Sequence, residues 1–385
     1  MTRLSSLDVY RGIVMFLVGM RLMELDEVAL NFPDSVVWRF IGFHSSHVPW
    51  FGCSLNDLIH PSFAFLTGTA LVFSVSARVG KGQSKSSLTL HALWRAVALI
   101  FLGIYIRSLG RDMTNWTFDE TLTQTGLSYM LVFALAFFGT KTRLFCCIAL
   151  LVAHWLIFAL YPILPPRLDP TAFNVPEGWS HDFTGFFAHW NHNRNAGWAF
   201  DLWLLNAFPR LSPYVGYLGG YTTINLLSTM PTMILGLMAG TWLKQIAQPT
   251  KCLVIAGTSC IAISLAMHFG GICPIVKHLW TPSWALFSGG GCFLILTAIH
   301  YLVDVRQWRR WTFPFVVVGM NSLAFYLMRH ALEIPLAEGL KQHLGTQIFQ
   351  IFGDALAPAL IGACSLLILW LIVLWMHRRK LYLRL

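Results

Sequence analysis

The sequence predicts an all-α membrane protein, a polytopic bundle of about ten transmembrane helices. Of its 385 residues, 56% are hydrophobic and only 11% are charged, whereas soluble proteins carry about 25% charged residues. The mean hydropathy is +0.61. The apolar residues form runs of about 20, the length at which a helix crosses roughly 30 Å of hydrocarbon. We therefore expect the lipid bilayer to surround most of the chain.

Ten apolar runs are long enough to be spans. Each is expected to be helical, because backbone polar groups find no water partner inside lipid. We interpret residues 1–385 as a single transmembrane domain. The expected spans are 9–30, 55–77, 88–107, 122–140, 144–163, 223–243, 252–270, 283–303, 312–328 and 355–376.

The distribution of lysine and arginine predicts the orientation. With the N-terminus in the cytoplasm, sixteen of the 27 basic residues, among them Arg3 and Arg384, fall in short cytoplasmic segments. Nine, including Arg167, fall in the much longer segments of the opposite side. Positive charge concentrates on the cytoplasmic side of membrane proteins, so we expect both termini there. The net charge of +10 then indicates orientation and not nucleic-acid binding.

The longest segment on the non-cytoplasmic side covers about residues 164–222. It contains the stretch WSHDFTGFFAHWNHNRNAGWAFDLWLLNAFPR, which is too rich in aromatic residues for a disordered linker. We expect residues 199–208 to lie along the membrane interface, where tryptophan and phenylalanine are enriched. A large cap on this side suggests that the chemistry, or its acceptor, is there.

Charged residues inside the apolar runs are candidates for function, because they are costly in lipid. Arg21 and Glu24 share the first expected span at a spacing of three residues, so they could pair. Arg95 lies in the third span. It either extends to the interface or serves as the cation for an anionic ligand such as a phosphate-bearing cofactor.

His47 and Asp57 stand at the start of the second span, in HVPWFGCSLNDLIHP. Asp57 is expected in the first helical turn, and His47 in the loop before it can fold back towards the carboxylate. A carboxylate that holds one imidazole nitrogen fixes the tautomer and raises the basicity of the ring. This suits a general base or an acyl acceptor; a purely structural histidine is the alternative. No metal is expected, because the neighbouring histidines lack a ligand spacing.

Two further patterns lie in later spans. Asn321 and Ser322, in VVVGMNSLAFYLMRH, could line a polar cavity or bond between helices. Gly236 and Gly240 form a GxxxG pattern, which predicts close helix packing.

Several stretches, in order along nearly the whole chain, together resemble one family. They include LDVYRG at 7–12, HVPWFGCSLNDLIHP at 47–61 and GMNS at 319–322. On these motifs the chain is similar to heparan-alpha-glucosaminide N-acetyltransferase and its bacterial relatives in the transmembrane acyltransferase superfamily. It looks closest to the bacterial branch, which implies a place in the bacterial cytoplasmic (inner) membrane.

The resemblance implies an enzyme that takes an acetyl group from cytosolic acetyl-CoA and delivers it to an amino sugar across the membrane. His47 matches the family's active-site histidine, and Asp57 matches the aspartate of the same motif. The remaining matches are Arg95 in the third span, Gln124 in the fourth, and Asn321 and Ser322 of GMNS, all expected near acetyl-CoA. Relatives also suggest a homodimer.

Two departures from the family concern catalysis and the acceptor. An asparagine of the first span in the mammalian enzyme is replaced by Leu22, and nearby Glu24 could serve instead. The common Gln-Arg-Leu-Gly of the fourth span reads Gln124-Thr125-Gly126, without the arginine.

The aromatic and amide side chains on the non-cytoplasmic side fit a carbohydrate, although the tryptophans could equally be interface anchors. The expected sugar-binding residues are Trp50, His189, Trp190, Asn193 and Asp201. Two other functions stay open: a transporter of a saccharide or lipid-linked intermediate, and a non-catalytic membrane scaffold. The absence of a recognisable internal repeat argues mildly against the transporter.

Overall fold

The computed structural model describes residues 4–164 and 170–383. Within these ranges helices dominate and no strand forms; an isolated bridge joins Phe51 and Val276. The prediction of an all-α fold is confirmed. Arg3, Arg167 and Arg384, which contributed to the predicted orientation, lie outside the described residues, and the orientation stays a prediction.

The chain divides into two compact units. Unit 1 comprises Met1–Val48, Cys53–Ile59 and Leu296–Leu385, and unit 2 comprises Pro49–Gly52 and His60–Ile295. The interpretation of the chain as a single domain stays a prediction. The helices of unit 1 are α1 (Ser5–Met20), α2 (Leu25–Leu30), α3 (Val36–Ser45), α12 (Phe313–Met320), α13 (Ser322–Leu344) and α14 (Ala357–Arg378). Those of unit 2 are α4 (Ile59–Val79), α5 (Lys85–Ser108), α6 (Thr121–Leu135), α7 (Thr140–Ala159), α8 (Ala196–Leu205), α9 (Leu226–Gln245), α10 (Thr250–Phe269) and most of α11 (Pro282–His300).

Seven helical segments in the described part of the chain are long and apolar enough to cross a membrane. An eighth span is possible if α12 and α13, which are bent by 82° at their junction, form one broken span. The chain therefore has the helices of an integral membrane protein, although the expected number of ten is not reached. The seven are Asn56–Val79, Lys85–Ser108, Thr140–Ala159, Thr223–Gln245, Thr250–Phe269, Pro282–Val305 and Asp354–Arg378.

Two of the ten expected spans form shorter helices because the backbone turns within an apolar run. The run at 9–30 ends as α-helix at Met20, continues as one 3₁₀ turn, and breaks at Glu24, whose φ of 47° is left-handed. The run at 122–140 ends as α6 at Leu135, where tight turns lead to the start of α7. The first break lies among the charged residues Arg21, Asp26 and Glu27, but hydropathy does not report the backbone conformation that ends the helix.

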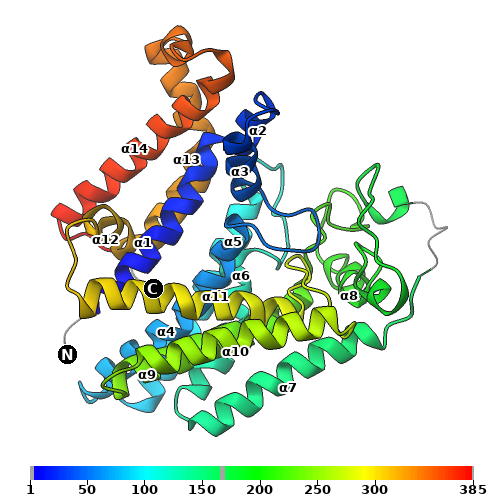
Figure 1. Ribbon diagram of the computed structural model, residues 1–385, viewed down its shortest axis with the longest axis vertical. Helices are drawn as coiled ribbons and strands as arrows, with labels where there is room; N and C mark the ends of the chain where they lie inside the picture. The colour runs from blue at the N-terminus through cyan, green and yellow to red at the C-terminus, as the bar shows by residue number, and fades with distance from the viewer. Residues whose placement is uncertain (1–3, 165–169, 384–385) are drawn as a thin grey trace. The chain divides into compact units, whose positions relative to one another are not determined.

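Glycines set the closest helix contacts in unit 2. Gly236 and Gly240 of α9 lie against the backbone of α4 at Phe65 and Thr69, and Gly68 of α4 lies against Met233. The Thr69 hydroxyl also donates to the carbonyl of Gly236 at 3.0 Å. The packing predicted from the GxxxG pattern is confirmed. Elsewhere in this unit, α5 packs on α6, and both α6 and α7 pack on α9 (Figure 1).

Glycines also set the closest helix contacts in unit 1. A Cβ at Gly12 of α1 would overlap the carbonyl of Phe315 in α12, and one at Gly319 of α12 would overlap the carbonyl of Asp8. Gly362 of α14 rests on the backbone at Leu22. Helices α13 and α14 also pack together, as the orange and red ribbons in Figure 1 show. This packing holds the C-terminal end of α1 in place, and the candidate site lies beside it.

We expect Gly236→Ala to lower the stability of the protein by about 1–3 kcal/mol, because the added methyl group overlaps the Phe65 carbonyl and forces α4 and α9 apart. Thermal unfolding in detergent checks this. Gly339→Ala is the matched control, since a Cβ there meets no atom within 4 Å; it should keep or raise stability. Equal unfolding temperatures for the two variants would contradict the glycine contact.

Candidate active site

A capping box fixes the loop that leads into α4. The Ser54 N–H donates to Asp57 Oδ2 at 2.8 Å, and the Asp57 N–H donates back to Ser54 Oγ at 3.3 Å. The two residues thereby satisfy donors at the start of the helical segment. The Ser54 hydroxyl donates to the Ser46 carbonyl at 2.6 Å. Ser54 was not among the predicted site residues, although the spacing Ser-x-x-Asp before an apolar run is its sequence signal.

His47 hydrogen-bonds to the other carboxylate oxygen. Its Nδ1 lies 2.7 Å from Asp57 Oδ1, and the Asp57 side chain is 0% exposed whereas that of His47 is 42% exposed. The Val48 N–H donates to Asp57 Oδ2 at 3.4 Å. Because a carboxylate only accepts, Nδ1 carries the hydrogen and Nε2 keeps its lone pair. The expected fold-back of His47 onto Asp57 is present, and in this tautomer Nε2 carries the lone pair that a base or nucleophile needs.

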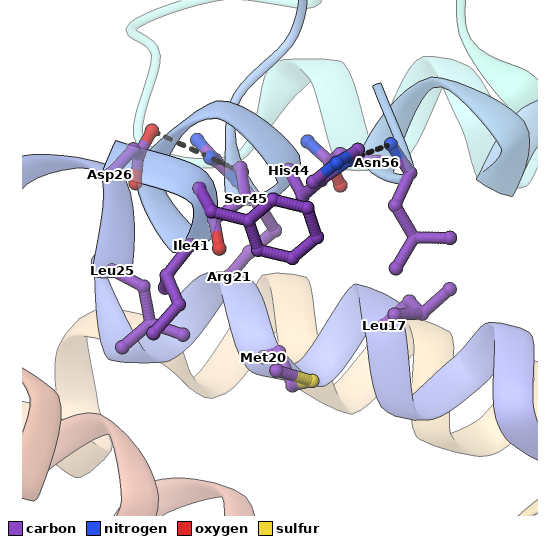
Figure 2. Close-up of a pocket in the computed structure, with 11 residues that line it drawn as sticks. Leu17, Met20, Arg21, Leu25, Asp26, Ile41, His44, Ser45 and Asn56 are labelled. Carbon is purple, nitrogen blue, oxygen red and sulfur yellow. Dashed lines mark hydrogen bonds and ion pairs between the residues drawn. The ribbon is translucent and has the colours of Figure 1, made fainter. Parts of the chain in front are cut away.

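A cavity of about 300 Å³ lies within unit 1, beside this pair. Asn56 contacts both the cavity and His47. It lines the cavity, and its Nδ2 lies 3.4 Å from His47 Nδ1 and 3.5 Å from His47 Nε2. Figure 2 shows the lining side chains converging from α1, α2, α3 and the residues before α4. They are Leu17, Met20, Arg21, Leu25, Asp26, Phe40, Ile41, His44, Ser45, Leu55 and Asn56.

The ion pair expected between Arg21 and Glu24 does not form. Arg21 Nη1 instead lies 2.8 Å from Asp26 Oδ2 and 2.6 Å from the carbonyl of Ser45. The left-handed backbone at Glu24 interrupts the helix that would have placed the two side chains on one face. Glu24 is exposed at this break, and its catalytic role stays a prediction.

Asn321 and Ser322 lie at the bend between α12 and α13 in unit 1. Asn321 is fully buried; its Oδ1 accepts the Leu383 N–H at 3.3 Å, and its Nδ2 has no partner among the residues described. A break in a membrane helix exposes backbone polar groups and is tolerated where it is enclosed by protein or lines a cavity. At the GMNS motif the chain therefore departs from regular helix, and the buried Asn321 Nδ2 is an available donor.

Arg95 and Gln124 belong to α5 and α6 of unit 2. The Arg95 guanidinium lies 5.0 Å from the centre of the Tyr129 ring, and its buried Nε has no hydrogen-bond partner in the described chain. Gln124 Nε2 donates to the carbonyls of Phe118 at 2.6 Å and Thr223 at 3.3 Å. Arg95 thus keeps a donor available for an anionic ligand, whereas the amide nitrogen of Gln124 is engaged in holding α6 to the start of α9.

The expected sugar-binding residues lie mostly inside the aromatic core of unit 2. Trp50 and Trp190 are buried, and the Trp50 indole N–H donates to the Trp190 carbonyl at 3.1 Å. Trp50 also stacks on His278, with ring centres 5.3 Å apart. His189 Nδ1 lies 2.8 Å from the Tyr161 carbonyl. These contacts give the side chains a structural role, and their contact with a sugar stays a prediction.

Asn193 and Asp201 also hold the loop together. Asn193 has a left-handed φ of 47°, and its amide donates to the carbonyls of Phe173 and Tyr217, both at 2.9 Å. Asp201 accepts the Thr223 N–H at 2.9 Å, which caps the turn that begins the ninth helix. Burial raises the pKa of Asp201 to about 7, against the lowering effect of this hydrogen bond.

In the part of the chain that the structure describes, no group of three or more histidine, cysteine, aspartate or glutamate side chains could hold a metal ion. The expectation that the protein uses no metal stays a prediction.

We expect the stability of the protein to fall as the pH rises from about 4 to about 7. The folded-state pKa of Asp201 lies above the usual value for aspartate, so the folded protein binds this proton more tightly than the unfolded chain does. Asp201→Asn should reduce this loss of stability with rising pH. At pH 8 its unfolding temperature should be several degrees above that of the wild-type protein. Unfolding temperatures at pH 4.5–8 measure this, with the exposed Asp354→Asn as control. A profile unchanged by Asp201→Asn would contradict it.

Comparison with known proteins gives two relatives. The chain is 26% identical over 371 residues to "Heparan-alpha-glucosaminide N-acetyltransferase" of Mus musculus, covering 86% of this chain and 54% of the relative. It is 27% identical over 372 residues to the protein of the same name from Homo sapiens, covering 86% and 53%. The chain thus spans about half the length of these relatives. No protein-family model matches it.

The similarity covers most of the chain. Its placement in a bacterial branch stays a prediction. At the level of the family, however, the resemblance seen in the motifs is confirmed: the chain is homologous to heparan-alpha-glucosaminide N-acetyltransferase.

Proposed function

We propose that the protein is a membrane acetyltransferase that moves an acetyl group from acetyl-CoA to a carbohydrate acceptor. The observation that carries the proposal is the His47–Asp57 pair: a buried carboxylate 2.7 Å from Nδ1 of an accessible imidazole. The homology to enzymes named as N-acetyltransferases supports the reaction class. The long apolar helices support its place in a membrane.

His47 Nε2 is the reacting atom in this proposal. In a direct transfer, the amine or hydroxyl of the acceptor gives its proton to Nε2 while it attacks the carbonyl carbon of the thioester. The C–S bond breaks, and the proton passes from Nε2 to the departing thiolate of CoA. In a two-step transfer, Nε2 itself attacks the carbonyl carbon, the C–S bond breaks and the thiolate leaves. The acceptor then attacks the acetyl carbon, the Nε2–C bond breaks, and Nε2 takes the proton of the acceptor.

Asp57 positions His47 in either route. Its carboxylate holds the Nδ1–H tautomer and stabilises the imidazolium that forms when Nε2 takes a proton or an acetyl group. The hydrogen bonds from Ser54 and Val48 to the second carboxylate oxygen keep Asp57 in place. The pair is therefore fixed before substrate binds, which lowers the cost of orientation in the reaction.

Acetyl-CoA is the proposed donor, and several residues fit it. The partnerless Arg95 Nε suits a phosphate oxygen, and the buried Nδ2 of Asn321 is a donor for a carbonyl. Ser322 and Gln124 are proposed as further residues for acetyl-CoA on the strength of the motifs alone. We also propose, as the family resemblance implies, that acetyl-CoA arrives from the cytoplasm and that the acceptor lies on the other side of the membrane.

We expect His47→Ala to lower acetyl transfer at least about 100-fold, because it removes the general base or acyl carrier. Asp57→Asn should lower the rate of acetyl transfer by about 10–100-fold, because the His47 imidazole remains but its tautomer is no longer fixed. The change should be larger in kcat than in KM. The measurement is transfer of radiolabelled acetyl from acetyl-CoA to a panel of amino sugars, with purified protein in liposomes. His343→Ala, a change at an exposed histidine, should leave the rate unchanged.

Transfer by His47→Ala at nearly the wild-type rate would refute the mechanism. Label that stays on the protein would indicate an acetyl-His47 intermediate facing an unsuitable acceptor. Movement of a saccharide without consumption of acetyl-CoA would favour a transporter. Folded protein that binds no acetyl-CoA but retains a protein partner would favour a scaffold.

A further inference from the structure

The cavity beside His47 is largely apolar and carries no net charge. Its walls include Leu17, Met20 and Ile41. Its basic and acidic side chains, Arg21 and Asp26, form an ion pair at 2.8 Å and so balance each other. A cavity of this composition favours an uncharged, apolar occupant.

The polar atoms of the cavity lie on one side. Figure 2 shows His44 and Asn56 opposite Leu17 and Met20, which come from α1. The Leu55 N–H donates to His44 Nδ1 at 3.2 Å, so in the neutral ring Nε2 carries the hydrogen and is a donor. Asn56 lies between the cavity and His47. The cavity is therefore amphipathic, with its polar side towards the reacting imidazole.

Helix α3 lines this cavity and also carries an exposed apolar face. None of its residues is buried, and several of its large apolar side chains are exposed: Val36 is 70% exposed, Phe40 64% and Phe43 50%. We expect a short helix with such an exposed apolar face to lie in the membrane interface. Phe40 also lines the cavity. An apolar group can thus pass from the bilayer into the cavity along one side of α3.

The size and lining of the cavity exclude the other parts of the proposed reaction. About 300 Å³ is far more than an acetyl group fills. A sugar ring placed among leucine, methionine and isoleucine would lose hydrogen bonds to water and regain few. The phosphates of CoA would meet no net positive charge here.

We infer that the cavity binds the apolar part of an amphiphilic acceptor, an alkyl or lipid chain attached to the sugar that is acetylated. This inference rests on the proposed function, because it assigns the acceptor of that reaction. The chain lies between α1 and α3, and the sugar to which it is attached lies at Asn56, next to His47 Nε2.

The test compares methyl and butyl glucosaminide, which differ by three methylene groups and share one sugar. Affinities for the purified protein in nanodiscs are measured by calorimetry, without acetyl-CoA. Each buried methylene strengthens binding about fourfold, so the butyl glycoside should bind at least about tenfold more tightly. Ile41→Trp, which fills the cavity, should abolish this difference. Val37→Trp is the matched control: Val37 lies on the same helix, outside the cavity, and the difference should persist.

Equal affinities of the two glycosides for the wild-type protein would overturn the inference, whether or not acetyl transfer occurs. Persistence of the difference in Ile41→Trp would overturn it as well. Should that variant fail to fold, Leu55→Phe replaces it, since Leu55 lines the cavity and is 44% exposed. A chain-length preference in binding, with no acetyl transfer to either glycoside, would sustain the cavity assignment and count against the proposed reaction alone.

Discussion

The geometry around His47 depends on one buried carboxylate. Asp57 is removed from solvent, and an ionised group in that position must be compensated by donors. The donors are the N–H groups of Ser54 and Val48 and the imidazole of His47. Because they come from both ends of the loop between α3 and α4, the carboxylate closes this loop and orients the imidazole at the same time. The start of a helix is also where the helix dipole favours a negative charge. Structure and proposed chemistry therefore rest on the same group.

The cavity exists because the first apolar run does not continue as one helix. The break at Glu24 lets α2 turn away from the direction of α1 and pack on α3, where Gly42 allows close contact with Ala29. Arg21, at the break, then reaches Asp26 and the Ser45 carbonyl. Irregular backbone at membrane depth is acceptable when it is enclosed by protein or lines a cavity. An uninterrupted helix over residues 9–30 would leave no such space between α1 and α3.

Local patterns were predictable from the sequence, and burial was not. The apolar runs, the close approach at Gly236 and the pairing of His47 with Asp57 all follow from patterns within short segments of the chain. The left-handed conformation of Glu24 was not predicted, because hydropathy and residue spacing do not report the backbone conformation of a single residue. The aromatic residues of the loop show why burial was not predictable. The sequence does not distinguish a tryptophan that binds sugar from one that packs in a core. The contacts of Trp50 with Trp190 and His278 show that Trp50 packs in the core.

The position of Leu22 bears on how the proposed chemistry is completed. The resemblance matches Leu22 to an asparagine of the mammalian enzyme, but Leu22 is buried and its backbone supports Gly362 of α14. It offers no polar group. Asn56, within the histidine motif itself, places an amide 3.5 Å from His47 Nε2. In the proposed reaction, we infer that this amide donates to the acetyl oxygen as negative charge develops on it. An amide lost from the first helix is thus compatible with catalysis, because another stands beside the same imidazole.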